Sequence, residues 1–402
     1  FDLETSGLSP AWDQILQFAA LRAETQTLVI KDRERDAINL RCRLRQEVIP
    51  SPAALVTTRV FPHDLDNAPL RHDELMVRID EFLTDCLPAA FVGHNAIRFD
   101  SQHLRHNLFC QLLPPYTLHM DGSLLVDTML LAQLIYALDP NALNWPRKPD
   151  GKLSFRLGDL CAANGIALDP DEAHDALADV SATLDLYRLM RCQSPAVFAL
   201  GTALASKHVV AGILQEDILG VIRVTGTGAT ITPVTVLPVL DQQRDPWPSR
   251  PNAMTLPNNP NGIVALDLGV DPKAYLNLGI DALETLFAGK SSPLKTIRIN
   301  AMPLVIPLDL TDAICPDASK ALCNIVPNHD PAEAQAELAR RTALVRDNPG
   351  FHHRLKVVLE RRDAARPTST HLEEQLYVGG FAKGEDFFEG LRMQRMDPKY
   401  RH

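Results

Sequence analysis

The sequence has little of what marks several common protein classes. Its seven cysteines are scattered over 402 residues and never form a CxxC pair, which argues against a disulfide framework and a structural zinc site. This cysteine usage predicts a reducing, cytoplasmic location. No run approaches the ~18 apolar residues that a membrane-spanning helix needs. Neither GxGxxG nor GxxxxGK[ST] occurs, which disfavours a nucleotide-binding α/β protein, and we interpret Gly226-Thr227-Gly228 as a turn.

Positive charge is also scarce. The chain has 40 Lys/Arg against 50 Asp/Glu, a net charge of −10 and a pI near 5.7. Domains that bind phosphate are usually basic, so the total counts against nucleic acid as a partner. Residues 340–402, however, hold 13 Lys/Arg against 9 Asp/Glu. Because a metal-dependent nuclease must itself hold several carboxylates, the net charge neither supports nor excludes nucleic acid as a partner.

The first 190 residues alternate between strand-like and helix-like patterns, which predicts an α/β sheet domain. The length of 402 residues suggests two or three domains in all. We expect short strands at residues 28–30 and 91–93. We expect helices at residues 74–86, 101–113 and 176–190.

The composition changes after Ser194-Pro195. A helix is expected over residues 196–208, and β-branched residues and glycines then predict a β-rich second domain. Its expected strands are residues 221–226, 229–240, 263–268 and 295–306. From residue 331 the pattern is helical and charged, with helices expected at 332–347 and 351–365.

Asp2 and Glu4 are the first candidates for chemistry. If residues 1–7 form a strand, the period of two puts both carboxylates on one face. Two such groups about 7 Å apart repel each other, and a divalent cation between them would remove that conflict. An exposed edge strand with solvated acids explains the segment equally well.

Two later segments carry further candidates. Asp100 follows Gly93-His94-Asn95 and an apolar run, near an expected helix start, where it could equally be a helix cap. In the segment from His174 to Asp179, Asp175 has the position of a helix cap. His174 would then precede the helix, with Asp179 one turn inside it. The alternative is a surface helix start with a solvated histidine.

Taken together, the segments 1–5, 93–100 and 174–179 resemble the three motifs of the DEDDh exonuclease superfamily. Three further segments narrow the likeness to the exodeoxyribonuclease I family: Ala142-Leu143-Asn144-Trp145-Pro146, Ser154-Phe155-Arg156-Leu157 and Ala163-Asn164-Gly165-Ile166. The resemblance implies an α/β fold that begins with an RNase H-like exonuclease domain, a mixed sheet with flanking helices, over residues 1–192. It also implies an SH3-like β-rich domain over 195–345. A C-terminal helical domain would start at 346–402 and be present only in part.

The same resemblance implies roles for individual residues. Asp2, Glu4, Asp100 and Asp179 would hold two Mg²⁺ ions, with Mn²⁺ as an alternative, and His174 would be the general base. Contacts with the substrate are implied for Glu4, Arg105, Tyr116, Phe155 and Arg156. A surface position is the plain alternative for Arg156. Trp145 and Phe99 are further stacking candidates, for which core packing is the alternative, and His119 and Met120 stand where the family has aromatic residues.

The implied activity is 3′→5′ hydrolysis of single-stranded DNA to 5′-mononucleotides, in DNA repair and recombination. The implied protein is a monomer that binds the C-terminal tail of the single-stranded DNA-binding protein. An RNA-directed or proofreading enzyme of the same superfamily is the nearest alternative, since the motifs act on a phosphate common to RNA and DNA. A nucleic-acid-binding protein without catalysis is a second alternative.

Overall fold

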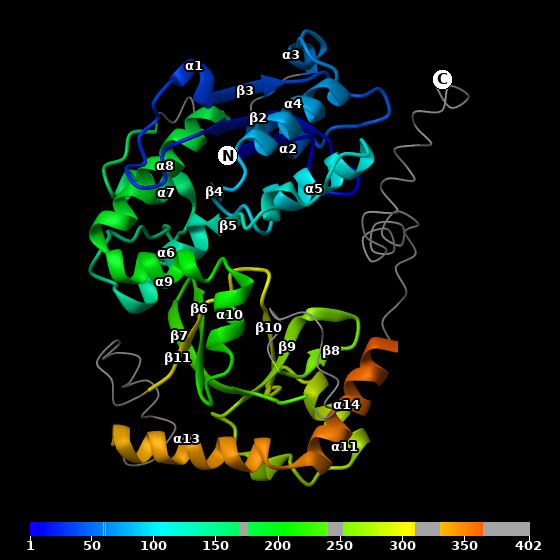
Figure 1. The fold of residues 1–402 in the computed structure, drawn as a ribbon, viewed down its shortest axis with the longest axis vertical. Helices are drawn as coiled ribbons and strands as arrows, with labels where there is room; N and C mark the ends of the chain where they lie inside the picture. Colours follow the sequence, from blue (N-terminus) through cyan, green and yellow to red (C-terminus); the bar gives the residue numbers. More distant parts are fainter. Residues whose placement is uncertain (59, 61, 169–175, 240–251, 310–329, 365–402) are drawn as a thin grey trace. The chain divides into compact units, whose positions relative to one another are not determined.

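The computed structural model describes residues 1–58, 60, 62–168, 176–239, 252–309 and 330–364 of the chain. The described residues form two compact units (Figure 1). Among the described residues, unit 1 contains those in 1–128 and 164–188, and unit 2 contains those in 129–163 and 189–364.

Unit 1 is built on two groups of strands. β1 (Asp2–Thr5), β2 (Ile15–Leu21) and β3 (Ala37–Arg41) form an antiparallel sheet in the order 1-2-3, whereas β4 (Ala90–Gly93) and β5 (Leu124–Asp127) pair in parallel. The nitrogen of Phe1 donates a hydrogen bond of 2.8 Å to the carbonyl oxygen of Val92, so β1 runs beside β4. A Cβ on Gly93 would lie 3.0 Å from the carbonyl oxygen of Phe1, which explains a glycine at this close approach.

The core of unit 1 lies between these strands and two helices. Leu3, Ile15 and Phe18 from the strands pack against α4 (His72–Asp85) and α5 (Asp100–Cys110). Residues of α4 recur at helical spacing on the buried side, among them Leu75, Met76, Ile79 and Leu83. The remaining helices of this unit are α1 (Arg33–Asp36), α2 (Pro52–Thr58), α3 (Pro62–Asp66), the 3-10 turn η1 (Thr117–His119) and most of α8 (Ala176–Gln193).

Unit 2 is built on an antiparallel sheet of six strands. Its order is β10-β9-β7-β6-β11, with β8 paired to β9. The strands are β6 (Leu219–Thr225), β7 (Gly228–Val236), β8 (Thr255–Leu256), β9 (Asn259–Asp267), β10 (Leu294–Arg298) and β11 (Val305–Pro307). The α/β fold class is therefore confirmed, and the SH3-like description of this sheet stays a prediction.

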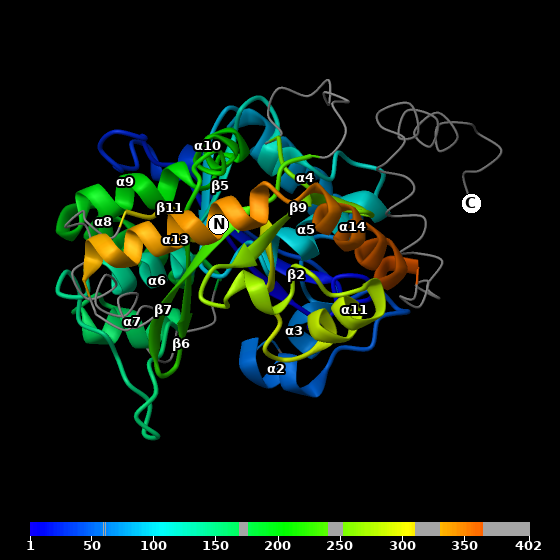
Figure 2. The ribbon, with the colours of Figure 1, turned by 90° about the horizontal axis from the view of Figure 1, so that it is seen from below.

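Helices cover the sheet of unit 2. Leu338 of α13 (Pro331–Arg346) packs with Ile218 and Leu268, and Phe351 and Leu355 of α14 (Pro349–Ala364) pack with strand and helix residues of a second cluster. Figure 1 shows α13 crossing one end of the strands of this unit, and Figures 1 and 2 show α11 and α14 side by side. The other helices of this unit are α6 (Thr128–Leu138), which begins at the unit boundary, α7 (Leu157–Ala163), α9 (Pro195–Ala203), α10 (Lys207–Ile213), η2 (Pro272–Ala274) and α11 (Ile280–Ala288).

The structure corrects several predicted elements. Residues 28–30 are not a strand: Leu28 has φ of 57° and closes a turn in which its N–H donates to the carbonyl of Glu24 at 2.7 Å. The helix expected over 196–208 is two helices, α9 and α10, separated by Leu204–Ser206. The strand expected over 295–306 is likewise two strands, β10 and β11. Part of the strand expected over 229–240 is β7, and its last residue lies outside the described residues.

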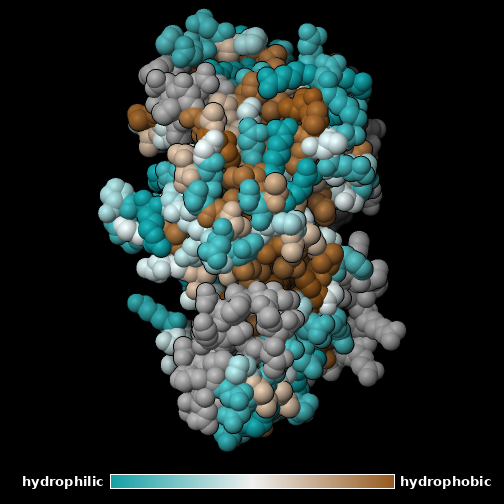
Figure 3. Space-filling view, turned by 90° about the vertical axis from the view of Figure 1, so that its left-hand side faces the viewer, coloured by the Kyte–Doolittle hydropathy of each residue, from teal (hydrophilic) through white to brown (hydrophobic). Residues whose placement is uncertain are grey.

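Within the described ranges, no single helix is long and apolar enough to cross a membrane. The bent pair α9 and α10 passes that test together, by length and composition only. On the face shown in Figure 3, hydrophilic residues surround several hydrophobic patches.

Candidate active site

The strand β1 presents Asp2 and Glu4 on one face, as predicted. Asp2 pairs with Ala19 of β2 and Glu4 pairs with Gln17, while Leu3 between them points into the core and is 4% exposed. The alternation of side chains along the strand therefore places Leu3 on the core face and the two acids on the opposite face. Glu4 is buried and Asp2 is half-buried, so neither is the fully solvated acid of the alternative interpretation.

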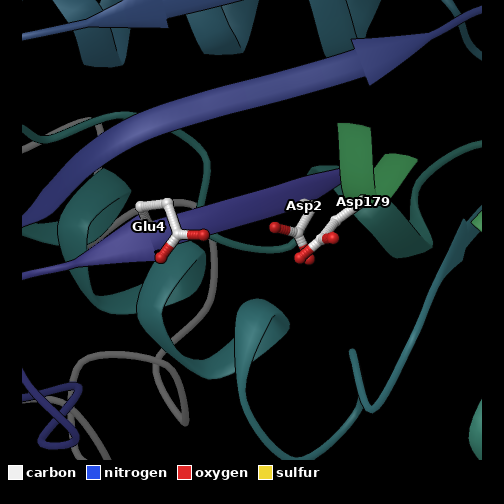
Figure 4. Close-up of side chains that lie close together, drawn as sticks. All are labelled: Asp2, Glu4 and Asp179. Carbon is white, nitrogen blue, oxygen red and sulfur yellow. The ribbon is translucent and has the colours of Figure 1, made fainter. Parts of the chain in front are cut away.

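The helix α8 brings a third carboxylate to this face. Ala176 and Val180 of α8 pack on Ala19, the β2 residue that pairs with Asp2. This packing fixes the first turns of α8 beside the strands, and Asp179 lies in them. Ligand oxygens of Asp2, Glu4 and Asp179 all come within 4.8 Å of one another. In Figure 4, Asp2 and Glu4 project from β1, and the carboxylates of Asp2 and Asp179 lie next to each other.

Burial and mutual repulsion dominate the electrostatics of the cluster. The pKa of Asp2 is raised well above its ordinary value, first by desolvation and then by the charges of Asp100, Glu4 and Asp179. Carboxylates gathered in this way favour one another's protonated forms unless a cation compensates them. The all-oxygen donor set suits hard divalent cations such as Mg²⁺ and Mn²⁺. The side chains therefore fit a divalent metal.

Asp100 is the first residue of α5 and lies beside the cluster. It is 3% exposed and accepts hydrogen bonds from its own backbone N–H and from that of Leu3. Desolvation raises the pKa of Asp100 to about 7, opposed by these hydrogen bonds. The bond to Leu3 ties Asp100 to β1, and its charge acts on Asp2. Asp100 is thus placed next to the three clustered acids, although it does not belong to the group of oxygens within 4.8 Å.

Asp127, at the end of β5, is a residue that the sequence analysis missed. It is fully buried, and its two carboxylate oxygens accept the backbone N–H groups of Asn95 and Ile97 at 3.0 and 3.1 Å. Its charge contributes to the raised pKa of Asp100. The signal was available, because an apolar run, Leu124-Leu125-Val126, ends abruptly in an acid.

The predicted base and cap of the third motif, His174 and Asp175, lie outside the described residues. The structure therefore leaves the role of His174 as a prediction. The described part of α8, Ala176–Gln193, covers the helix expected over residues 176–190.

Two of the predicted substrate contacts lie together in unit 1. The guanidinium carbon of Arg105, on α5, lies 5.6 Å from the centre of the Tyr116 ring, and its Nη2 donates to Gln102 at 2.8 Å. Tyr116 is 39% exposed, so this cation–π pair includes an accessible aromatic face. Phe99, one residue before Asp100, lies 4.4 Å from the ring of His103 and is half-buried.

The other predicted contacts, Phe155 and Arg156, belong to unit 2. Phe155 packs against Trp145 and Tyr136 with both ring centres at 5.9 Å, so it is part of an aromatic cluster. Arg156 is exposed and precedes α7. Their contact with substrate stays a prediction.

Comparison with known proteins identifies the domain that holds the carboxylates. Residues 1–187 match the sequence model of the exonuclease family, described as "Exonuclease". Residues 1–187 therefore resemble an exonuclease domain in sequence. It is 27% identical to exodeoxyribonuclease I of Escherichia coli strain K12 over 401 residues, covering 96% of this chain and 76% of that protein. It is 28% identical to exodeoxyribonuclease I of Haemophilus influenzae, covering 76% of this chain and 63% of that protein.

Solved structures show the same fold. The structure of E. coli exonuclease I in complex with a dT13 oligonucleotide superimposes with a TM-score of 0.76 at 23% identity, covering 98% of this chain and 78% of the other. The ExoI/SSB-Ct complex superimposes with a TM-score of 0.68 at 24% identity, covering 94% and 75%. The resemblance to bacterial exodeoxyribonuclease I therefore extends over most of the chain, which is a nuclease. Enzymes of the DEDDh superfamily depend on divalent metal ions.

Proposed function

We propose that the protein is a 3′→5′ exonuclease that hydrolyses single-stranded DNA to 5′-mononucleotides. The observation that carries this proposal is the cluster of Asp2, Glu4 and Asp179, with oxygens within 4.8 Å, inside a domain that matches the exonuclease family. The preference for DNA rests on the relatives, which are named exodeoxyribonuclease I, and on the extent of the likeness beyond residue 187. An RNA-directed or proofreading enzyme of the same superfamily is the alternative.

The roles of the side chains follow from their chemistry. Asp2, Glu4 and Asp179, together with the adjacent Asp100, would hold two Mg²⁺ ions, and Mn²⁺ has the same preference for oxygen ligands. Two bound ions would supply positive charge to the attacking and leaving oxygens of the phosphodiester. His174 would take the proton from the attacking water, because imidazole titrates near neutral pH. Asp127 keeps Asp100 in place by holding the loop before α5.

The proposed substrate contacts come from residues on both units. Arg105 offers a charge and Tyr116 an accessible ring on unit 1, and a base stacked on such a ring gains ~1–3 kcal/mol. Phe155 and Arg156 would contribute from unit 2. We assign residues 1–192 to the exonuclease domain, 195–345 to an SH3-like β-rich domain and 346–402 to the beginning of a helical domain.

The biological setting is proposed from the same relatives. The role would be in DNA repair and recombination in the cytoplasm, with the protein acting as a monomer. The partner would be the C-terminal tail of the single-stranded DNA-binding protein, consistent with the ExoI/SSB-Ct complex among the similar structures.

A cleavage assay tests the proposal directly. The protein is incubated with a 5′-labelled single-stranded DNA oligonucleotide, a matched RNA and a blunt DNA duplex, each with Mg²⁺ or with EDTA. The expected result is a Mg²⁺-dependent ladder that shortens from the 3′ end on single-stranded DNA alone. Preference for the RNA would move the assignment to the alternative. An absence of cleavage on every substrate, with Mg²⁺ or Mn²⁺, would contradict the proposed activity.

A further inference from the structure

A basic hairpin in unit 2 stands apart from the acidic character of the chain. Residues 147–152, with the sequence Arg-Lys-Pro-Asp-Gly-Lys, contain three cations and one acid, in a protein whose net charge is −10. All six residues are exposed. In Figure 2 the segment between α6 and α7 extends as a narrow loop beyond the neighbouring helices of its unit. Such a concentration of positive charge on a projecting, exposed segment is accessible to an anionic ligand.

The backbone holds this hairpin in one shape. The N–H of Gly151 donates to the carbonyl of Lys148 at 2.8 Å, and the N–H of Lys148 donates to the carbonyl of Lys152 at 2.8 Å. Pro149 presets its own φ, and Gly151 takes the left-handed φ of 80° that a three-residue hairpin loop requires. Below the loop, Arg147 pairs with Leu153. The three cations are therefore presented by an ordered turn, so little chain entropy is lost when a ligand binds.

The hairpin is also anchored to the sheet. The N–H of Leu153 donates to the carbonyl of Gly226 at 2.8 Å, in the turn between β6 and β7. A Cβ on Gly226 would lie 3.0 Å from the Cβ of Lys152 and 3.2 Å from its Cδ, so the stem of Lys152 lies directly over this glycine. The turn Gly226-Thr227-Gly228 therefore packs against the hairpin, and it is not a phosphate-binding loop. The charged end of Lys152 stays in solvent, where it meets Asp150 at 2.9 Å.

Aromatic residues flank the hairpin on the same unit. Trp145, Phe155 and Tyr136 form one cluster, in which Trp145 and Tyr136 meet edge to face at 5.2 Å. All three are half-buried. Arg156, exposed, adds a fourth cation just after the cluster. Cations interleaved with aromatic rings suit a single-stranded nucleic acid, which offers evenly spaced phosphates and unstacked bases.

We propose that the hairpin of Arg147, Lys148 and Lys152 binds the phosphate backbone of a single-stranded nucleic acid. This inference rests on the proposed function, because it assigns the hairpin to the substrate strand. Lys148 and Lys152 act as point charges that tolerate any base sequence, and Arg147 donates to the carbonyl of Gly151 at 2.8 Å, which holds its guanidinium at the hairpin. The contact increases affinity for long strands and leaves the chemistry at the carboxylates unchanged.

The salt dependence of binding tests the assignment. A dye-labelled oligothymidylate is titrated with the full chain in EDTA, which prevents cleavage, at several NaCl concentrations, and binding is followed by fluorescence anisotropy. Each phosphate contact of a single strand contributes about 0.7 to the slope of log K against log salt. The variant Arg147→Ser/Lys148→Ser/Lys152→Ser should therefore lower that slope by roughly 2. Lys148→Arg/Lys152→Arg should keep it.

A matched variant controls for the loss of net charge. Lys273, Lys290 and Arg298 are exposed on unit 2 outside the hairpin, and their triple serine variant should retain most of the slope. An equal loss in both triple variants, or no loss in either, would overturn the proposal. The proposal would also be overturned if the hairpin variant lost affinity for polyglutamate, a polyanion without phosphate, and kept the wild-type slope of log K against log salt for DNA. Unchanged melting temperatures show that the variants are folded.

The hairpin and the proposed function can fail separately. Hydrolysis of thymidine 5′-p-nitrophenyl phosphate reports on the carboxylate site with a substrate that carries one phosphodiester. The hairpin variant should hydrolyse it at the wild-type rate and degrade long single strands less well at high salt. If the wild type degrades single-stranded DNA and the hairpin variant has the same salt slope, only the inference about the hairpin is wrong. If the wild type has no nuclease activity, the proposed function is wrong whatever the slope.

Discussion

The carboxylate of Asp127 accepts the backbone N–H of Asn95 at 3.0 Å, across 32 residues of sequence. Its second oxygen accepts the N–H of Ile97 at 3.1 Å. Asn95 has a left-handed φ of 61°, so the loop it belongs to is held in a conformation that few residues adopt alone. Nearby, His94 Nδ1 lies 2.9 Å from the hydroxyl of Thr128. The end of β5 thus fixes the loop that leads into Asp100.

Asp127→Ala should destabilise unit 1 and lower nuclease activity. The substitution leaves two backbone N–H groups of the loop without their acceptor, which costs about 1–3 kcal/mol for each that stays buried. Asp127→Asn retains one acceptor oxygen and should fall between the wild type and Asp127→Ala. Urea denaturation measures the free energy of unfolding. Glu81→Ala, which removes an exposed acid from α4, is the control and should have little effect.

Strand alternation correctly predicted that Asp2 and Glu4 share one face of a strand, but the neighbouring strands were predicted poorly. Alternation along a strand is a local pattern, whereas the grouping of Asp179 with Asp2 and Glu4 came from the resemblance to the DEDDh motifs. Asp127 was missed although an apolar run ends at it, because that local pattern does not show that the acid accepts the backbone N–H of Asn95, 32 residues away. The same limit explains the failure at residues 28–30. That apolar triplet looks like a strand, yet the carbonyl of Leu28 accepts the guanidinium of Arg188, 160 residues away.

The strands β2 and β3 also depend on long-range contacts that a local sequence pattern does not reveal. Both were absent from the prediction, although β2 is the central strand of its sheet. Six of its seven residues are apolar without alternation, because both faces are covered, and the one polar side chain is that of Gln17. Gln17 is 1% exposed and donates to Asn39 of β3 at 2.8 Å. A buried amide that pairs with the next strand cannot be distinguished from a surface residue by sequence pattern alone.

Asp2→Asn should abolish cleavage and stabilise the metal-free protein. The pKa of Asp2 is raised by burial and by three neighbouring acids, so its ionised form is unfavourable in the folded state without a cation. The amide removes this repulsion at nearly the same volume. Thermal unfolding in EDTA at neutral pH should show a higher melting temperature for Asp2→Asn than for the wild type. Mg²⁺ should raise the melting temperature of the wild type and have a smaller effect on the variant. Equal melting temperatures of the wild type and Asp2→Asn in EDTA would contradict the repulsion between Asp2 and its neighbouring acids.

His72 should make unit 1 sensitive to acid. It is 3% exposed, its Nε2 lies 2.8 Å from Asn107 Oδ1, and burial lowers its pKa to about 4. Because the folded pKa lies below the ordinary 6.5, the neutral ring contributes fully to stability above 6.5, and this contribution is lost as the pH falls toward 4. The loss amounts to roughly 3 kcal/mol. His72→Gln, which keeps a donor for Asn107, should unfold in urea with a weaker pH dependence over this range. His208→Gln, at an exposed position of α10, should retain the wild-type dependence.

His174→Ala should lower the rate of cleavage by ~10²–10⁴-fold, the contribution of a positioned general base. The variant should still bind single-stranded DNA in EDTA with the wild-type affinity, because the predicted function of His174 is to accept a proton from water and not to hold the strand. The pH–rate profile separates this role from a structural one. Between pH 6 and 9 the wild-type rate should rise with the ionisation of an imidazole and then level off, whereas the variant should lose that rise and recover part of the rate when exogenous imidazole is added. His353→Ala, which removes an exposed histidine from α14, is the control and should keep the wild-type profile. A His174→Ala enzyme that cleaves at the full rate at neutral pH would show that another group activates the water.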